Sequence, residues 1–232
     1  MNLPLQNQTV LISGSGRGLG SDIARSFSRE GAKVVINYRK SIKNAEELAE
    51  ELGEDTFILQ GDIRNKEEVF SMQSNLEKNQ ISITTIIHNA IEDYSFNGEE
   101  RKKINEIDWV DFQKQIETSQ KGFLNLLQVF TPVMKQNHFG RIITIGTNLF
   151  QNPVVPYHDY TASKGGLLSL TRTAAIDLGP DNITVNMVSG GLLKITDASK
   201  ATPESVFDYI AGMTPLRKIT TTEDFADAVL FF

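Results

Sequence analysis

Two ionisable residues stand four positions apart in the segment Tyr160-Thr-Ala-Ser-Lys164. On a helix, this spacing places both side chains on one face. A lysine ammonium beside a phenol stabilises the tyrosinate and lowers the phenol pKa from about 10 toward neutrality. Tyr160 could then donate or accept a proton at a carbonyl oxygen. Taken alone, the spacing more often marks an ordinary pair of neighbours on a helix, so chemistry requires a site around it.

A glycine-rich segment, SGSGRGLG at residues 13–20, follows the first apolar run. Glycines at 14, 18 and 20 allow a tight turn, close approach of a pyrophosphate, and packing of a helix against a strand. The N-terminus of that helix would offer free N–H groups and a positive dipole to phosphate. A plain strand-to-helix turn remains the alternative. A P-loop is disfavoured, because no Lys-Ser/Thr follows the last glycine.

Composition limits the classes of function. The 232 residues, 40% of them hydrophobic, suffice for one large core. A net charge of −6 and the lack of a dense basic run argue against nucleic-acid binding. With no cysteine, disulfides, thiolate nucleophiles and zinc–thiolate sites are excluded. Because the chain also shows no leader and no apolar run of about 20 residues, we expect a cytoplasmic protein without a membrane segment.

Short apolar, β-branched runs alternate with longer amphipathic stretches. Such runs suit parallel strands covered on both faces, and the alternation is typical of a βαβ series. The sequence therefore predicts an α/β fold: one domain over residues 1–232, a doubly wound parallel sheet in a three-layer, Rossmann-like α/β/α arrangement. The predicted strands lie at 9–13, 33–37, 56–60, 84–88, 141–145 and 183–188. The predicted helices lie at about 19–30, 43–52, 66–78, 108–136, 158–178 and 204–212.

Two segments are predicted to be substrate-side loops. Residues 91–108 are polar and charged between a strand and a helix, and residues 190–215 follow the last strand. The C-terminal residues 223–232 resemble an amphipathic helix that stops while still apolar. Either a further strand follows or a partner covers its last residues, which are Leu230, Phe231 and Phe232.

Several motifs, in order, resemble those of the short-chain dehydrogenase/reductase family. SGSGRGLG resembles the family's T-G-x-x-x-G-x-G fingerprint, with Ser13 in place of threonine, and YTASK resembles its Tyr-x-x-x-Lys pair. The resemblance implies that Asp62 in GDIRN contacts the adenine and that Asn89 in HNAI has a structural, cofactor-lining role. Ile91 departs from the usual glycine. The alternatives are a helix N-cap for Asp62 and an ordinary turn asparagine for Asn89.

The cofactor is predicted from the end of the second strand. NAD enzymes usually place a carboxylate there for the ribose 2′-OH, whereas Tyr38 stands at that position here and Arg39 and Lys40 follow it. Arg17 in the glycine-rich turn adds a further cation. We therefore predict NADP(H), the alternative being that these are solvated surface cations. The predicted cofactor-binding residues are Gly14, Arg17, Gly18, Leu19, Gly20, Tyr38, Arg39, Asp62, Ile63, Asn89, Tyr160 and Lys164.

The resemblance also implies two further catalytic positions, and this chain departs from the family at both. Thr147, thirteen residues before Tyr160, stands where a serine bonds the substrate carbonyl, and it keeps a hydroxyl. Ser119 stands where an asparagine supports a water-bridged proton relay, and its side chain is too short to reproduce the amide. Asn148 and Asn152 are the neighbouring residues that could contribute. A third departure is Gly190, where the family has proline, which predicts a more flexible loop.

The remaining conspicuous residues are predicted to have structural roles. His88, His138 and His158 form no metal-ligand pattern, so we predict surface or turn histidines and no metal. An apolar helical face, predicted to be core or subunit interface, consists of Trp109, Phe112, Ile116 and Phe123. The resemblance implies homodimers or homotetramers formed through the helices that begin at 108 and 158.

Within the family, the chain is most similar to 3-oxoacyl-(acyl-carrier-protein) reductases, in GRIITIGT and in TPLRKITTTEDFADAVLFF. The predicted function is NADPH-dependent reduction of a ketone, a 3-oxoacyl thioester in fatty acid biosynthesis, with acyl carrier protein as the candidate partner. One alternative is reduction of another small carbonyl compound, since one fold serves many substrates. The other is a non-catalytic NADP-binding regulatory or scaffold protein, which the changes at Ser119 and Thr147 permit.

Overall fold

Six short apolar segments form one parallel sheet in the computed structural model, which describes residues 3–194 and 196–232. Residue 195, inside the predicted loop 190–215, and residues 1–2 of the predicted domain lie outside this description. The strands pair in the order β3-β2-β1-β4-β5-β6, which confirms the predicted fold class. Their bounds are β1 Thr9–Ile12, β2 Lys33–Tyr38, β3 Thr56–Gln60, β4 Thr85–His88, β5 Gly140–Thr147 and β6 Ile183–Gly190.

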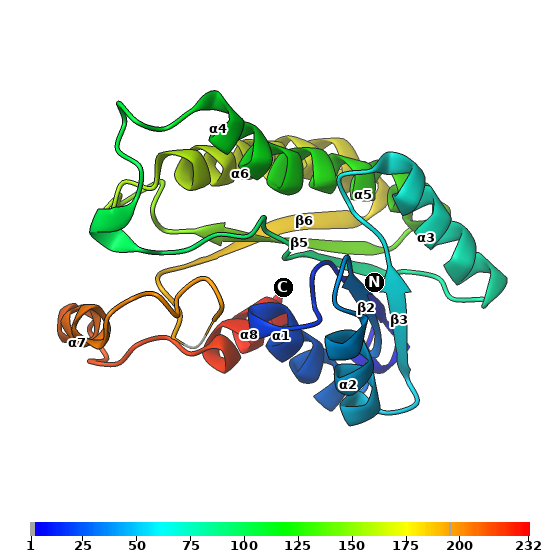
Figure 1. Cartoon of the computed structure of the whole chain (residues 1–232). Helices are drawn as coiled ribbons and strands as arrows, with labels where there is room; N and C mark the ends of the chain where they lie inside the picture. The colour runs from blue at the N-terminus through cyan, green and yellow to red at the C-terminus, as the bar shows by residue number, and fades with distance from the viewer. Residues whose placement is uncertain (1–2, 195) are drawn as a thin grey trace.

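Helices cover both faces of this sheet (Figure 1). One layer contains α1 Gly18–Arg29, α2 Ile42–Leu52 and α8 Thr222–Phe231. The opposite layer contains α3 Lys66–Lys78, α4 Trp109–Ile116, α5 Gly122–Gln136 and α6 His158–Leu178. The short α7, Glu204–Met213, lies in the long segment after β6, at one end of the molecule. No helix in the described part of the chain combines the length and apolar character needed to cross a membrane.

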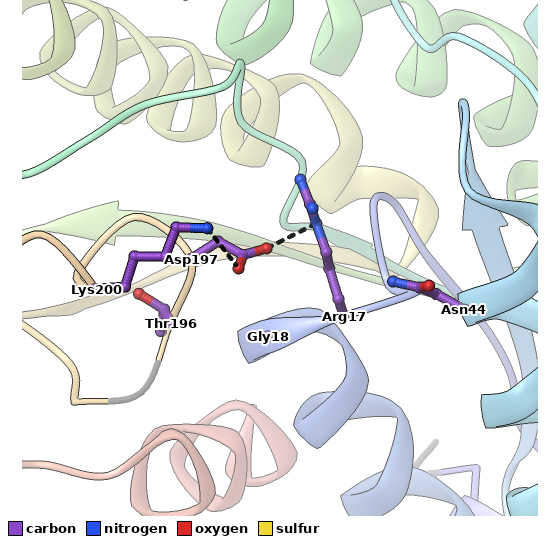
Figure 2. Close-up of a pocket in the computed structure, with 6 residues that line it drawn as sticks. All are labelled: Arg17, Gly18, Asn44, Thr196, Asp197 and Lys200. Atoms are coloured by element: carbon purple, nitrogen blue, oxygen red, sulfur yellow. Dashed lines mark ion pairs between the residues drawn. The ribbon is translucent and has the colours of Figure 1, made fainter.

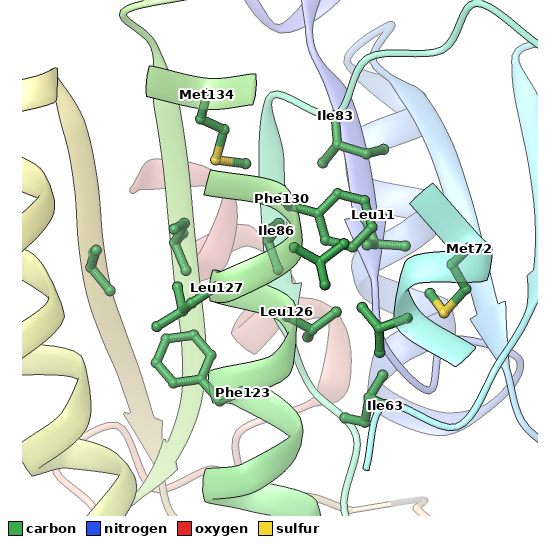
Figure 3. Packing of buried hydrophobic residues seen from close by; sticks show 14 of the residues in the cluster. Leu11, Ile63, Met72, Ile83, Ile86, Phe123, Leu126, Leu127, Phe130 and Met134 are labelled. Carbon is green, nitrogen blue, oxygen red and sulfur yellow. The ribbon is translucent and has the colours of Figure 1, made fainter. Parts of the chain in front are cut away.

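The strands read as continuous apolar runs because both of their faces are buried. Along β1, Val10 and Ile12 pack against the α1, α2 and α8 layer, whereas Leu11 between them packs against the other layer. All three side chains are fully buried. In Figure 3, Phe130 points from α5 toward Leu11 and Ile86 of the sheet. The few polar side chains within the strands, such as Thr85 and Thr144, are buried, so groups that meet a ligand are expected at the ends of the strands.

The predicted helix at 108–136 is not one continuous α-helix. A π turn over Glu117–Lys121 separates α4 from α5. The extra residue of a π turn rotates the following helix by about 100° relative to the preceding one. The predicted apolar face is therefore split: Phe123 is fully buried in the core, whereas Trp109 is 66% exposed and stacks on Phe112 at 5.9 Å.

The C-terminal segment forms a helix, as predicted. Thr221 and Asp224 make a capping box at the start of α8, and Asp227 pairs with Arg29 of α1 at 2.8 Å. Leu230 packs partly into the core, while Phe231 is 83% exposed. That a further strand or a partner covers the end of this helix therefore remains a prediction.

Candidate active site

The predicted site residues gather along the carboxyl edge of the sheet. Each one ends or follows a strand, or lies near the start of α1 or α6 or in the π turn beside α6. In doubly wound sheets, ligands bind in the crevice at this edge. Eight residue pairs join β5 to β6, and the last pair places Thr147 beside Gly190, so the end of β5 lies beside the start of the loop that follows β6.

The glycine-rich turn has the shape that a pyrophosphate requires. Gly18 adopts a left-handed backbone with φ +58°, and the space where a Cβ would stand is open within 4 Å among the described atoms. At Gly20, by contrast, a Cβ would lie 2.6 Å from Asn89 Nδ2, so only glycine permits this packing of helix on strand. No side chain in the described segments caps the N-terminus of α1. The turn therefore fits a phosphate group bound through backbone N–H groups.

Asn89 holds the end of β4 against this turn. Its Nδ2 donates to the carbonyl oxygens of Ser13 at 3.1 Å and Gly14 at 3.2 Å. Gly14 has φ +65° and lies against Ala90, where a Cβ would stand 3.1 Å from the Cα. The structure thus gives Asn89 more than the role of an ordinary turn residue, because it joins two cofactor-side loops.

A cavity of about 400 Å³ opens beside Gly18 (Figure 2). Arg17 crosses it and lies 2.9 Å from Asp197 and 3.6 Å from Asp93. Arg17, expected to meet a phosphate, thus faces two carboxylates from loops distant in sequence. The cavity is lined by Arg17, Gly18, Asn44, Thr196, Asp197 and Lys200.

Asp62 is not the N-cap of α3, because Asn65 accepts the first N–H groups of that helix. Its carboxylate instead accepts Arg64 Nη2 at 2.6 Å and lies 3.9 Å from Arg39. Burial by itself raises the pKa of Asp62, but the bonds from Arg64 outweigh it and hold that pKa below its ordinary value. Arg64, two residues after Asp62 in GDIRN, is a site residue that the sequence argument did not single out.

Three other predicted cofactor residues point toward the protein interior. Ile63 is buried against Gly122, where an added Cβ would come within 2.7 Å of Ile63 Cδ1. Tyr38 is only 8% exposed, and Leu19 packs partly against the core. These side chains therefore pack in the protein interior next to the site.

Tyr160 and Lys164 lie on the first turns of α6, both buried. Lys164 Nζ donates to Ile145 O at 2.7 Å and lies 5.9 Å from the centre of the Tyr160 ring. Burial raises the pKa of Tyr160 to about 12, although a hydrogen bond with the Thr147 side chain lowers it. Burial lowers the pKa of Lys164 to about 8. Desolvation is thus the largest influence on Tyr160 in this structure, and the lowering of its pKa expected from Lys164 together with the positive charge of a nicotinamide stays a prediction.

The π turn brings Ser119 to the same place. Gln120 Nε2 donates to Ser163 O at 3.3 Å, which fixes the turn against α6 between Tyr160 and Lys164. Ser119 is buried, and its Oγ has no hydrogen-bond partner among the described residues. Leaving a hydroxyl buried and unpaired is unfavourable, which marks Ser119 as an unusual residue in the wall of the site.

His88 is not the surface or turn histidine that the sequence predicted. It is fully buried, because β4 is an inner strand with both faces covered, and its ring stacks on Phe123 at 5.3 Å. Its Nε2 lies 2.9 Å from Ser119 O and its Nδ1 lies 3.4 Å from Ser13 Oγ. Burial, and then the charge of Lys164, lower the pKa of His88 to about 3, so the ring is neutral and Nε2 donates.

The other two histidines lie nearer the surface. His138 is exposed in a turn with φ +48°, as predicted, and His158 is the half-buried first residue of α6.

An aromatic cluster from the predicted loop 91–108 covers Tyr160. Tyr94 stacks on the Tyr160 ring at 5.2 Å and donates from its hydroxyl to Asp159 Oδ1 at 2.9 Å. Phe96 packs edge-on against Tyr160 at 5.3 Å, and Tyr157 packs against Phe96 at the same distance. Sequence reasoning missed these aromatic residues, because only the folded loop brings them to Tyr160.

The two predicted substrate-side loops meet at this cluster. Phe96 N donates to Ala198 O at 2.8 Å, and Thr202 Oγ1 donates to Phe96 O at 3.0 Å. Gly190, predicted to be a point of flexibility, has a packing reason as well, since a Cβ there would lie 2.5 Å from the Phe225 ring. Asn148 N donates to Gly190 O at 2.9 Å, which ties the strand end after Thr147 to this loop.

The chain is similar to known oxidoreductases along almost its whole length. The family model described as enoyl-(acyl carrier protein) reductase matches residues 14–232. The 3-oxoacyl-[acyl-carrier-protein] reductase FabG of Staphylococcus epidermidis is 30% identical over 228 residues, which cover 97% of this chain and 91% of that protein. The 7alpha-hydroxysteroid dehydrogenase of Escherichia coli is 29% identical over 234 residues, with coverage of 99% and 88%.

A solved structure shares the fold. A gluconate 5-dehydrogenase from Burkholderia cenocepacia J2315, in complex with NADP and tartrate, superposes with a TM-score of 0.86. It is 23% identical and covers 97% of this chain and 87% of its own, so it shows the fold alone.

The buried Lys164 predicts a specific pH dependence of stability. Its pKa is about 8 in the folded chain against an ordinary 10.5, so between these values the unfolded chain binds the additional proton and the stability of the folded state rises with pH. Lys164→Met removes this effect. We expect the free energy of unfolding of the variant, relative to wild type, to fall by up to about 3 kcal/mol between about pH 7 and pH 10.5. Urea unfolding at each pH measures it, and a constant difference across that window would contradict it.

The unpaired hydroxyl of Ser119 predicts that Ser119→Ala keeps or raises the thermal midpoint, since an unpaired buried hydroxyl costs about 1–3 kcal/mol. The matched control is Ser163→Ala, a buried serine nearby whose Oγ donates to Tyr160 O at 2.8 Å. We expect the control to lose stability. A larger loss for Ser119→Ala in calorimetry would show that this hydroxyl has a partner in solution.

Proposed function

The chain belongs to the short-chain dehydrogenase/reductase family of NAD(P)-dependent oxidoreductases, and from this premise we propose that it reduces a 3-oxoacyl thioester with NADPH. The observation that carries the proposal is the meeting of Tyr160, Lys164 and Thr147 at the sheet edge that also presents the glycine-rich turn. We propose that the protein acts in the cytoplasm as a homodimer or homotetramer, and that acyl carrier protein is its partner.

The protonation states of the buried pair suit reduction. A phenol whose pKa is about 12 remains protonated at neutral pH, so Tyr160 is a proton donor for a carbonyl oxygen that becomes an alkoxide. Thr147, which bonds Tyr160, can donate to the same oxygen and orient it. Lys164, with a pKa of about 8, is an ammonium at neutral pH and stabilises the tyrosinate that remains. When bound, a reduced nicotinamide would supply the hydride.

The cofactor would be held by this chain's own residues along the carboxyl edge. The backbone at Gly18 and the N-terminus of α1 would bind the pyrophosphate, and Asp62 would face the adenine. Arg39, with Arg17 and Lys40, would bind the 2′-phosphate, for which guanidinium groups are well suited.

The wall around Tyr160 supports the proposed substrate class. The rings of Tyr94, Phe96 and Tyr157 present apolar faces there, and apolar faces favour an acyl chain over a polyhydroxylated sugar acid. The similarity to the staphylococcal 3-oxoacyl reductase supports the same choice. The deciding assay follows NADPH consumption with an acetoacetyl thioester and with a panel of other ketones. Turnover of another ketone but not of the thioester would replace this substrate with another small carbonyl compound.

Tyr160→Phe should reduce kcat by about a hundredfold or more, because the ring remains and only the proton donor is lost. The affinity for NADPH should be unchanged, which a fluorescence titration measures. A phenylalanine variant that retained near-normal activity would assign the proton transfer to another acid.

Arg39→Asp should weaken NADPH binding relative to NADH by about 2–4 kcal/mol, because a phosphate partner becomes a repelling carboxylate. Since Asp62 already lies 3.9 Å from Arg39, the new carboxylate would add to an existing negative charge. Titration with both nucleotides provides an internal control. Equal weakening of the two would remove Arg39 from the cofactor assignment.

A further inference from the structure

Glu92 directs its carboxylate toward two arginines, of which Arg39 is expected to bind the cofactor. Its Oε2 accepts Arg64 Nη1 at 2.8 Å and Thr118 Oγ1 at 3.3 Å, and lies 3.4 Å from Arg39 Nη1. The side chain is only 16% exposed. Asp62 pairs with the same two arginines, at 2.6 Å from Arg64 and 3.9 Å from Arg39. Two guanidinium groups and two carboxylates therefore neutralise one another.

This cluster bridges the crevice at the carboxyl edge. Arg39 follows β2, Asp62 and Arg64 follow β3, and Glu92 follows β4. In the sheet, β1 and its glycine-rich turn lie between β2 and β4, so the ion pairs join loops from the two sides of that turn. A dinucleotide that runs along this edge must pass the Glu92 carboxylate.

We propose that Glu92 determines cofactor specificity, by competing with the 2′-phosphate of NADPH for Arg39 and Arg64. The inference rests on the proposed use of a nicotinamide dinucleotide and concerns its adenosine end. A 2′-phosphate carries more than one negative charge, so it is repelled by Glu92 and must displace it from the arginines. The 2′-hydroxyl of NADH is neutral, so the Glu92 carboxylate does not repel it and it does not compete for the arginines. Glu92 therefore weakens the binding of NADPH and leaves that of NADH almost unchanged.

Limited solvent exposure gives this competition its strength. Arg39 is 30% exposed and Arg64 is 26% exposed, so their pairing with Glu92 is only partly screened by water and salt. The neighbouring residue Asp93 differs in this respect. It is 73% exposed and lies 3.6 Å from Arg17, itself 59% exposed (Figure 2 shows this arginine). An exposed pair of this kind contributes little.

The test is Glu92→Gln, with Asp93→Asn as the matched control. Both variants remove one negative charge from the same loop at adjacent positions, and glutamine keeps the size of the side chain and its capacity to bond Thr118. We expect Glu92→Gln to bind NADPH about tenfold more tightly in a fluorescence titration, with a change of less than about twofold for NADH. Asp93→Asn should change either affinity by less than about twofold.

A second arm tests whether Glu92 acts through Arg39. In an Arg39→Met background, the gain from Glu92→Gln should shrink to about threefold or less, since only Arg64 then remains to be released. A gain of the full size in that background would overturn the proposed competition at Arg39. Thermal midpoints of all variants verify that each is folded.

The remaining outcomes separate this inference from the proposed function. An unaltered ratio of NADPH to NADH affinity for Glu92→Gln overturns the inference alone. Weaker NADH binding with unchanged NADPH binding also overturns it, because Glu92 would then be an acceptor for the ribose hydroxyl. A wild-type chain that binds neither nucleotide overturns the proposed function and the inference with it.

Discussion

Hydrogen bonds around Ser13 join the ends of β1 and β4, and the geometry of the site depends on this junction. Ser13 Oγ accepts the N–H groups of Asn89 at 3.0 Å and Ala90 at 3.1 Å, while Asn89 Nδ2 donates back to Ser13 O. His88 extends the junction, since its ring contacts Ser13 on one side and Ser119 on the other. The π turn that contains Ser119 is in turn fixed to α6 through Gln120. The glycine-rich turn and the Tyr160 helix are therefore held by one connected set of polar contacts.

Burial determines the pKa values of Tyr160 and Lys164. Desolvation disfavours the charged form of either group, so it raises the pKa of Tyr160 to about 12 and lowers that of Lys164 to about 8. Both groups still carry their protons at neutral pH, which is the state required to protonate a reduced carbonyl oxygen. The aromatic cover from Tyr94 and Phe96 maintains this environment, because it keeps the ring of Tyr160 away from water.

The basic residues near the glycine-rich turn already have ion-pair partners within the protein. From the sequence alone, both Arg17 and Arg39 are expected to bind phosphate. In the structure, Arg39 faces Glu92 and Asp62, and Arg17 faces Asp93 and Asp197. The positive charge of these arginines is therefore balanced by carboxylates of the protein, with which an anionic ligand would compete.

The sequence by itself determined the features that depend on neighbours along the chain. Continuous apolar runs identified the strands, glycine spacing identified the turn after β1, and a spacing of four placed Tyr160 and Lys164 on one face of α6. The predicted helix at 158–178 coincides with α6 for the same local reasons.

Only the tertiary structure decided the features whose partners lie far away in the chain. His88 meets Ser119 across 31 positions, and Arg39 meets Glu92 across 53. The π turn at 117–121 has no signature in residue type, because packing between β4 and α6 sets it. The pKa of Tyr160 likewise depends on how completely the loops exclude water, and desolvation is a property of the assembled fold rather than of any segment.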